Sequence, residues 1–280
     1  MYERVNPEHP DKLADRISGA IVDLAYSKND KARVAVEINI GHGRCFIIIE
    51  TNVKIFRKEV VSIINRILSE DVKIDLISIR QDKNLAKNQK YHVRCGDNGI
   101  FRGDIVTQEE RELTEIAYNI FKRYPYDGKY IINNDKLTIC QSNSNSNKLR
   151  KVYSDAVVNP LGDWHGGVNV DTGAVNRKLG SDMGNSVTGG GLHGKDLSKP
   201  DVTLSIYSWL KAQILNKKVD LSCAIGDRIV DNRRYSEIVR IAKKYINELG
   251  GFEKFAEWGL IRPKELDVDL ENFKQFFIDR

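Results

Sequence analysis

The most constraining feature of this sequence is a change of hydrophobic period near its N-terminus. Apolar residues recur at helical spacing from Asp11 to about Tyr26, and then alternate with polar or small residues over 33–40. The first pattern predicts an amphipathic helix, and the second predicts a half-buried strand. A Gly-His-Gly turn at 41–43 and the largely apolar stretch 45–51 indicate that a second strand returns beside the first.

Helices and strands continue to alternate along the chain. A helical period over 55–68 precedes a strand near 73–79, and this order predicts an α+β fold with helices on one face of a mainly antiparallel sheet. Further helices are predicted at 109–123, 200–215 and 235–249, and further strands within 130–140 and at 219–225. The polar segments 80–92 and 142–147 are expected to be loops, the first of them mobile.

Length and composition indicate an ordinary globular protein. A chain of 280 residues can bury two or three cores, and 41% hydrophobic with 30% charged residues is typical of this class. No apolar run reaches the roughly 18 residues of a membrane helix, and the N-terminus has no apolar secretory segment. The four cysteines are scattered without metal-type spacing, so reduced thiols and a cytoplasmic location are expected. The net charge of +5 is compatible with an anionic substrate but does not identify one.

Charged motifs lie at two distant places in the sequence. His9, Asp11 and Lys12 begin the first predicted helix, Arg177-Lys178 follows a turn, and GGGLHGKDLSKPD carries two lysines and a further carboxylate. Carboxylates hold Mg²⁺ through hard oxygen ligands, Lys and Arg neutralise phosphate, and glycines let backbone N–H groups approach an anion. Together these motifs predict a site for a polyphosphate and its divalent cations.

These motifs resemble those of the S-adenosylmethionine synthetase (methionine adenosyltransferase) family. The segment ERVNPEHPDKLADRISGAIVD is similar to the family's N-terminal signature, and NPLGDWHGGVNVDTGAVNRK and GGGLHGKDLSKPD are similar to its two later signatures. The resemblance implies S-adenosylmethionine synthetase-like subdomains whose middle and C-terminal parts are reduced. The expected division is an N-terminal α+β subdomain at 1–103, a reduced middle subdomain at 104–160 and a C-terminal part with the phosphate-binding loops at 161–280.

The resemblance also implies a role for each matching residue. The candidates for catalysis are His9, Lys12, Lys136, Arg177, Lys178, Lys195 and Lys199, and those for ATP binding add Trp164 and Asp171 to His9, Lys136 and the later basic residues. Methionine is expected to contact Glu50, Gln81, Asp97 and Lys199. Asp11 and Asp201 are the expected ligands of two Mg²⁺ ions per site, and Glu37 of K⁺.

Several of these residues also have an ordinary structural interpretation. Asp11 is favourable at any helix N-terminus, Glu37 can face solvent on an alternating strand, and Asp97 lies in a Gly-Asp-Asn-Gly sequence that forms a good β-turn. A lone lysine such as Lys136 is by default a surface residue. The sequence departs from the family at Glu8, Asp163 and His193, where the family has Gly, a basic residue and a small or hydroxyl residue.

The implied reaction is transfer of the adenosyl group of ATP to the sulfur of L-methionine, followed by hydrolysis of tripolyphosphate. The family's active sites lie between subunits, which implies a homodimer or a tetramer built from it, with the methionine carboxylates of one subunit near the triphosphate site of the other. One alternative is a weakened relative that binds a nucleotide or S-adenosylmethionine, and another is a tripolyphosphatase. A nucleic-acid-binding module is disfavoured, because the lysines concentrate in the motifs, and no membrane partner is expected.

Overall fold

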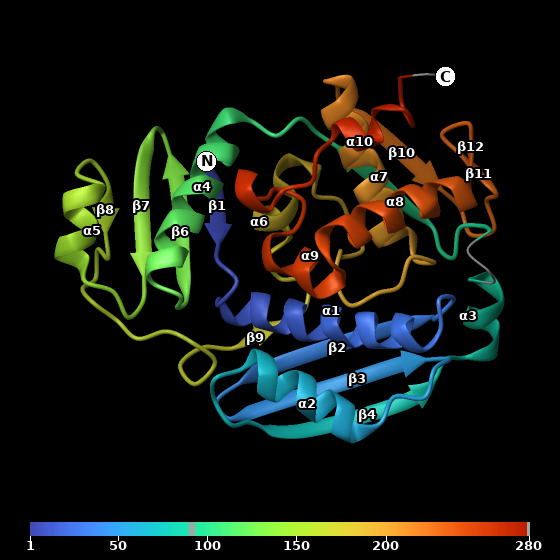
Figure 1. Cartoon of the computed structure of the whole chain (residues 1–280), viewed down its shortest axis with the longest axis horizontal. Coiled ribbons are helices and arrows are strands. Elements are labelled where there is room, and N and C mark those ends of the chain that lie inside the picture. Colours follow the sequence, from blue (N-terminus) through green and yellow to red (C-terminus); the bar gives the residue numbers. More distant parts are fainter. Residues whose placement is uncertain (90–92, 279–280) are drawn as a thin grey trace.

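The largest sheet positions most of the motif residues. The computed structural model describes residues 1–89 and 93–278. The largest sheet has the strand order β4-β3-β2-β9 (Figure 1). The strands are β2 Val34–Gly41, β3 Arg44–Thr51, β4 Lys73–Arg80 and β9 Gly173–Ala174. Strand β2 is antiparallel to β3 and to β9, whereas β4 is parallel to β3. The parallel edge is possible because helix α2 (Arg57–Ile67) crosses between β3 and β4.

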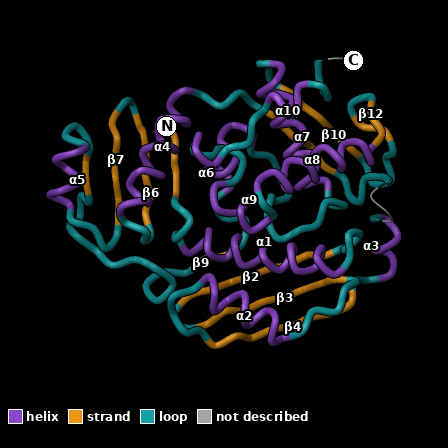
Figure 2. Tube along the Cα trace, in the orientation of Figure 1, coloured by secondary structure: helices purple, strands orange, loops and turns teal. Residues whose placement is uncertain are grey.

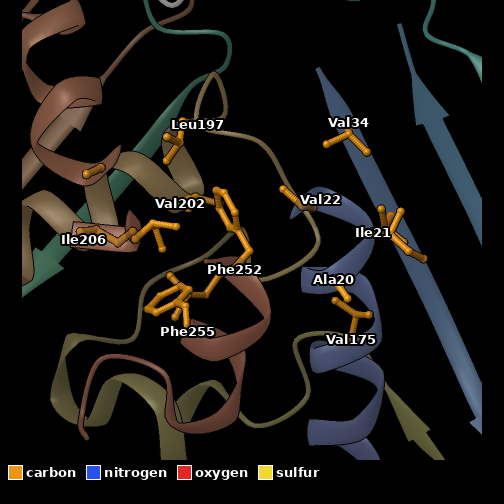
Figure 3. Close-up of a cluster of buried hydrophobic side chains, with 14 of the residues drawn as sticks. Ala20, Ile21, Val22, Val34, Val175, Leu197, Val202, Ile206, Phe252 and Phe255 are labelled. Carbon is orange, nitrogen blue, oxygen red and sulfur yellow. The ribbon is translucent and has the colours of Figure 1, made fainter. Parts of the chain in front are cut away.

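Helix α1 (Pro10–Lys28) begins where the sequence supplies both a cap and a proline. His9 is the N-cap, and its side chain accepts a hydrogen bond from the backbone of Asp11. Pro10 occupies the first turn, where its missing N–H costs nothing. The helix lies between the sheet and α9 (Phe252–Trp258), and Figure 3 shows Ile21 of α1 on the sheet side. A Cβ on Gly19 would lie 2.6 Å from the carbonyl oxygen of Phe252, so only glycine permits this close approach.

The alternation in β2 and β3 buries one face of the sheet and exposes the other. Val36, Ile38 and Ile47 are buried in the main core, whereas the opposite face carries apolar side chains in contact with solvent. The exposed fractions on that face are Phe46 51%, Ile48 44%, Ile77 56% and Ile79 49%. Helices therefore cover one face only, as the sequence predicted.

A second, smaller sheet has its own core. It has the strand order β1-β6-β7-β8, and Figure 1 shows it with helices α4 and α5. The bounds of these elements are β1 Tyr2–Val5, β6 Gly128–Asn133, β7 Lys136–Gln141, β8 Val157–Val158, α4 Gln108–Arg123 and α5 Ser146–Val152. Leu113, Tyr130, Ile139 and Trp258 belong to this core. Strand β1 precedes α1 directly, so the N-terminal segment connects the two sheets.

Most of the remaining elements lie on the far side of α1 from the large sheet and complete the main core, whereas α3 (Lys83–Asn88) lies beside the end of that sheet (Figure 2). They include α7, packed on β5, and α8, packed on α7. The bounds are β5 Gly99–Gly103, α6 Leu179–Met183, α7 Pro200–Leu215, β10 Val219–Cys223, β11 Ile229–Val230, β12 Arg233–Arg234, α8 Tyr235–Leu249 and α10 Glu271–Lys274, with 3-10 turns at Gly184–Ser186 and Lys264–Leu266. Strands β5 and β10 pair antiparallel.

The predicted α+β class is confirmed, and so are the main helices and strands, within a few residues at their ends. The loop predicted over 80–92 is wrong in part, because it contains helix α3. Asp82 caps this helix by accepting hydrogen bonds from the backbone of Asn84 and Leu85 at 2.8 and 3.2 Å. The last residues of that loop, 90–92, lie outside the described residues. Likewise, α5 begins inside the polar segment 142–147, with Asn145 as its cap.

The three-part division of the chain, with boundaries after residues 103 and 160, stays a prediction. Among the described helices, none has both the length and the apolar character needed to cross a bilayer.

Candidate active site

The N-terminus of α1 and the basic loop at 177–178 form a first charge cluster, made of His9, Asp11, Arg177 and Lys178. Asp11 is buried, and its Oδ1 accepts a hydrogen bond from the backbone of Ala174 at 2.9 Å. Lys178 Nζ lies 3.2 Å from Asp11 Oδ2, and Arg177 Nη1 lies 3.7 Å from Oδ1. The sequence separates these residues widely, and β9 joins them by pairing with β2 beside the start of α1.

His9 is held neutral in this cluster. Burial lowers the pKa of His9 to about 4, with Lys178 and Lys129 acting in the same direction against the raising effect of Asp11. Its Nδ1 accepts the backbone N–H of Asp11 at 3.2 Å. The proton of the neutral ring is therefore on Nε2, which leaves that nitrogen as a hydrogen-bond donor.

Asp127 and Lys129 lie beside this cluster, and the sequence interpretation missed both. The pKa of Asp127 is raised to about 7, mainly by burial and also by Asp171 and Glu8, while a hydrogen bond from the backbone of Gly167 and the charge of Lys129 act in the opposite direction. A Cβ on Gly166 would lie 2.7 Å from Asp127 Cβ and 2.9 Å from the ring of Trp164, so the half-buried Trp164 lies close to this carboxylate. Asp171 is exposed nearby and accepts a hydrogen bond from the backbone of Thr172.

Lys136 does not join the first charge cluster. Strand β6 pairs with β1 so that Lys129 lies opposite Val5, close to His9, whereas Lys136 lies opposite Asn133 at the far end of the β6–β7 hairpin. The four steps along the strand from residue 129 to residue 133 correspond to about 13 Å. The signal that could have identified Lys129 is its position two residues after Asp127 at the start of a strand.

A second charge cluster is formed by Asp97, Lys195, Lys199 and Asp201. Lys195 Nζ lies 2.7 Å from Asp201 Oδ2. A Cβ on Gly96 would lie 2.9 Å from the carbonyl oxygen of Ser198, so the turn with Asp97 packs against the segment with Lys199. Asp97 and Asp201 both act on the pKa of the Cys223 thiol, which places the two carboxylates in one neighbourhood. Asp97 therefore lies on the same side as Lys195, not with Arg177.

The other candidate residues lie on or beside the exposed sheet face. Glu37 is exposed on β2, and Glu50 on β3 lies opposite Ala35. Gln81, at the end of β4, is buried and donates from Nε2 to Gln89 Oε1 at 2.6 Å. Gln89 contacts Gly96, so Gln81 is linked to the turn that carries Asp97.

The two charge clusters lie at opposite ends of β2. Strand β9, which leads to Arg177, pairs with Asn39 and Ile40, whereas Lys195 forms a bridge with Ala35. Four to five strand residues separate these points, or about 15 Å. The chain thus carries both charge clusters along the same strand, and we refer to the first cluster as the first half-site and to the second cluster as the second half-site.

Lys12 does not face either half-site. Its ammonium group is fully buried and lies 2.7 Å from both carboxylate oxygens of Asp182 and 3.3 Å from Asp15 Oδ2. His193 Nε2 lies 3.0 Å from Asp182 Oδ2. We refer to Lys12, Asp15, Asp182 and His193 as the buried charge cluster. Lys12 and His193 hold the pKa of Asp182 well below its usual range, although burial alone would raise it.

The carboxylates of the two half-sites have the chemistry of Mg²⁺ ligands. The ammonium group of Lys178 lies 3.2 Å from Asp11, and that of Lys195 lies 2.7 Å from Asp201. A divalent cation can compensate the negative charge of either carboxylate in the same way. Asp15, Asp182 and His193 also lie close enough to share an ion, but Lys12 already supplies the cation there.

Comparisons with known proteins found similar sequences. The family model "S-adenosylmethionine synthetase, N-terminal domain" matches residues 1–87. The S-adenosylmethionine synthase of Acholeplasma laidlawii is 27% identical over 302 residues, covering 80% of this chain and 76% of that protein. That of Helicobacter hepaticus is 41% identical over 54 residues, which cover only 19% of this chain and 14% of that protein.

A solved structure shares the whole fold. The structure described as an unusual S-adenosylmethionine synthetase from Campylobacter jejuni aligns with a TM-score of 0.70 and 19% identity, covering 98% of this chain and 99% of that chain. At this identity the likeness shows the fold alone. The chain therefore has the fold of that synthetase, its first 87 residues match the N-terminal domain of S-adenosylmethionine synthetases, and over most of its length it is similar to an S-adenosylmethionine synthase.

Proposed function

We propose that this protein is a methionine adenosyltransferase, which makes S-adenosylmethionine, phosphate and diphosphate from ATP, L-methionine and water. The observation that carries the proposal is the pair of half-sites at opposite ends of β2, each combining a carboxylate with lysine or arginine. Cations in both half-sites suit a triphosphate, and the second half-site adds Asp97 for the methionine ammonium group. The residue types therefore match both substrates.

The chemistry explains why the site is rich in cations and has no strong base. A thioether sulfur carries no proton, so its attack on C5′ of ATP needs alignment rather than deprotonation. The difficult part is departure of the triphosphate, whose charge grows on the bridging oxygen. His9, neutral with its proton on Nε2, is suited to donate to that oxygen. Arg177, Lys178, Lys195 and Lys199 bind the phosphates, and we assign Lys129, in place of Lys136, to the same task.

Asp11 and Asp201 are the proposed ligands of Mg²⁺, and Glu37 of K⁺. Bound Mg²⁺ would supply further stabilisation of negative charge on the triphosphate oxygens. The half-buried Trp164 offers an aromatic face for adenine, and Asp171 lies beside it. Glu50, Gln81 and Asp97 remain the proposed methionine contacts.

The complete site requires two subunits. The exposed face of β2–β4 carries four apolar side chains and both half-sites lie along β2. Pairing two such faces about a two-fold axis, with their β2 strands antiparallel, brings the first half-site of one subunit to the second half-site of the other. We therefore propose a homodimer with two shared sites, in which Asp97 and Lys195 come from the same subunit.

The direct test is to incubate the purified protein with ATP, L-methionine, Mg²⁺ and K⁺, and to assay S-adenosylmethionine by mass spectrometry. Formation of product that stops when Mg²⁺ is chelated supports the proposal. Phosphate release from tripolyphosphate without S-adenosylmethionine would instead identify a tripolyphosphatase. Binding of ATP without either reaction would identify a nucleotide-binding relative.

The departure at Glu8 does not favour the binding-only alternative. Arg16 Nη1 lies 2.8 Å from Glu8 Oε1, so an internal ion pair compensates the extra carboxylate beside the first half-site. Its charge is therefore not directed at the nucleotide.

A further inference from the structure

His193 lies in the glycine-rich segment 189–195, two residues before Lys195, and connects the two basic loops. Its backbone N–H donates to Asn176 Oδ1 at 2.8 Å, and Asn176 Nδ2 donates to the carbonyl oxygen of His193 at 3.1 Å. Asn176 directly precedes Arg177. Both main-chain groups of His193 are thus held by the loop of the first half-site, while the chain continues into the second.

The imidazole of His193 is directed into the buried charge cluster. Nε2 lies 3.0 Å from Asp182 Oδ2 and 3.8 Å from Asp15 Oδ2, and the ring packs on Phe255 at 5.4 Å between centroids. His193 is only 3% exposed. Asp15 Oδ1 also accepts the backbone N–H of Asn176 at 2.9 Å. One buried set of charges therefore holds Asn176, which precedes Arg177, and His193, which lies two residues before Lys195.

This cluster is a scaffold and not a metal site. Lys12 Nζ makes three short contacts with the two carboxylates, at 2.7, 2.7 and 3.3 Å, which is where an ion would have to bind. A divalent cation bound to these carboxylates would have to displace the fully buried ammonium group of Lys12. The Nε2–H group of His193 is a second donor to Asp182 Oδ2, which also contacts Lys12, and further hydrogen bonds stabilise a buried carboxylate.

The loop around Lys195 is anchored differently on its two sides. After Lys195, Asp196 exchanges backbone and side-chain hydrogen bonds with Val34 at 3.1 and 2.8 Å. Before it, Gly189, Gly190 and Gly191 have no side chains, and Gly190 and Gly191 have φ values of +102° and +83°. The carbonyl oxygen of Gly194 accepts the backbone N–H of Val36 at 2.7 Å, and Leu192 is buried in the main core. The side chain of His193 adds a hydrogen bond to Asp182 to these anchors on the glycine side of Lys195.

We propose that His193 is a positioning residue of the phosphate site, which fixes Lys195 by donating a hydrogen bond from Nε2 to Asp182. The chemical part of this inference rests on the proposed function. The ring fills the space against Phe255, and the N–H group fixes the loop, so the two contributions can be separated by substitution. A displacement of about 1 Å at a catalytic group can cost about 100-fold in rate.

The test compares His193→Phe, which keeps a ring but has no donor, with His193→Gln, which keeps a donor. His193→Phe should lower kcat about 100-fold with a change of less than about twofold in KM for methionine. His193→Gln should stay within about fivefold of the wild type. If His193→Phe gives no folded protein, His193→Met, which also lacks a donor, replaces it. The control for general destabilisation is Leu113→Ala, in the core of the smaller sheet.

Two further measurements separate positioning from a merely structural role. The double variant His193→Phe, Lys195→Ala should have nearly the same kcat as Lys195→Ala alone, because both substitutions act through the ammonium group of Lys195. Calorimetric binding of magnesium tripolyphosphate should weaken equally in the two single variants, and this readout does not need a working adenosyl transfer. If no S-adenosylmethionine forms but this binding pattern holds, the proposed function fails and the positioning role stands.

Three outcomes would overturn the inference. The first is that His193→Phe binds tripolyphosphate and turns over as the wild type does. The second is that the losses in kcat of the two single variants multiply in the double variant. The third is that Leu113→Ala loses as much kcat as His193→Phe.

Discussion

At the residue scale, Asp127 lies where burial and neighbouring carboxylates oppose its ionisation. Its pKa is raised to about 7, from an ordinary value near 3.8. The folded protein therefore binds this proton more tightly than the unfolded chain does. The stability that this group contributes is fully present below about pH 4, and it is lost as the pH rises to about 7.

We expect Asp127→Asn to remove this pH dependence. Without ligands, the melting temperature of the variant minus that of the wild type should be larger at pH 8 than at pH 5, because only the wild type must ionise a buried carboxyl group. Calorimetry at the two pH values measures this difference. Asp135→Asn, in the exposed turn of the β6–β7 hairpin, is the control and should show no such change. An equal difference at both pH values would contradict the assignment.

A second prediction at this scale distinguishes two lysines of the same hairpin. Lys129→Ala should lower kcat/KM for ATP about 100-fold, since it removes a cation beside His9 and Asp127. Lys136→Ala, at the far end of the hairpin, should change it less than about twofold. Steady-state kinetics of both variants shows whether the phosphate-binding lysine is Lys136, as the sequence suggested, or Lys129, as the structure favours.

At the element scale, the apolar face of β2–β4 should determine assembly. Ile48→Lys should leave the monomer folded, because Ile48 is 44% exposed there. It should weaken dimerisation more than about 100-fold, since an unpaired charge buried at an interface costs about 3 kcal/mol or more. Sedimentation at micromolar protein measures the effect, and activity should fall in parallel. Ile229→Lys, on β11 and 58% exposed, is the control.

The elements themselves could be predicted better than their partners. Hydrophobic period identified α1 and β2, and α7 was also predicted as a helix although it is buried over most of its surface. Nothing in the local pattern showed that β1 pairs with β6 or that β5 pairs with β10, since these contacts join segments far apart in the chain. For the same reason the basic start of α1 could not reveal that Lys12 is buried, because its partner Asp182 is remote in sequence.

At the scale of the whole molecule, the separation of the half-sites predicts which inactive variants can restore each other. Arg177→Ala and Lys195→Ala lie in different half-sites, so a mixed dimer has one wild-type site and one doubly altered site. After subunit exchange, half of the dimers are mixed and activity should recover to about a quarter of the wild-type value. Asp97→Ala mixed with Lys195→Ala should recover nothing, because both lie in the same half-site. Recovery in the second mixture would refute the arrangement.

The contact between Gly19 and Phe252 has a consequence for how the protein is made. Asp23 of α1 also accepts the backbone N–H groups of Phe252 and Glu253, at 2.8 and 2.9 Å, so the first helix is covered by a segment near the end of the chain. At bacterial or eukaryotic synthesis speeds, the ribosome reaches Phe252 on the order of 10–50 s after it has passed Gly19. During that interval the side of α1 that later meets α9 is uncovered. Folding of the main core must therefore finish after residue 252 has been synthesised, and a nascent chain halted before that residue should require a chaperone to stay unaggregated.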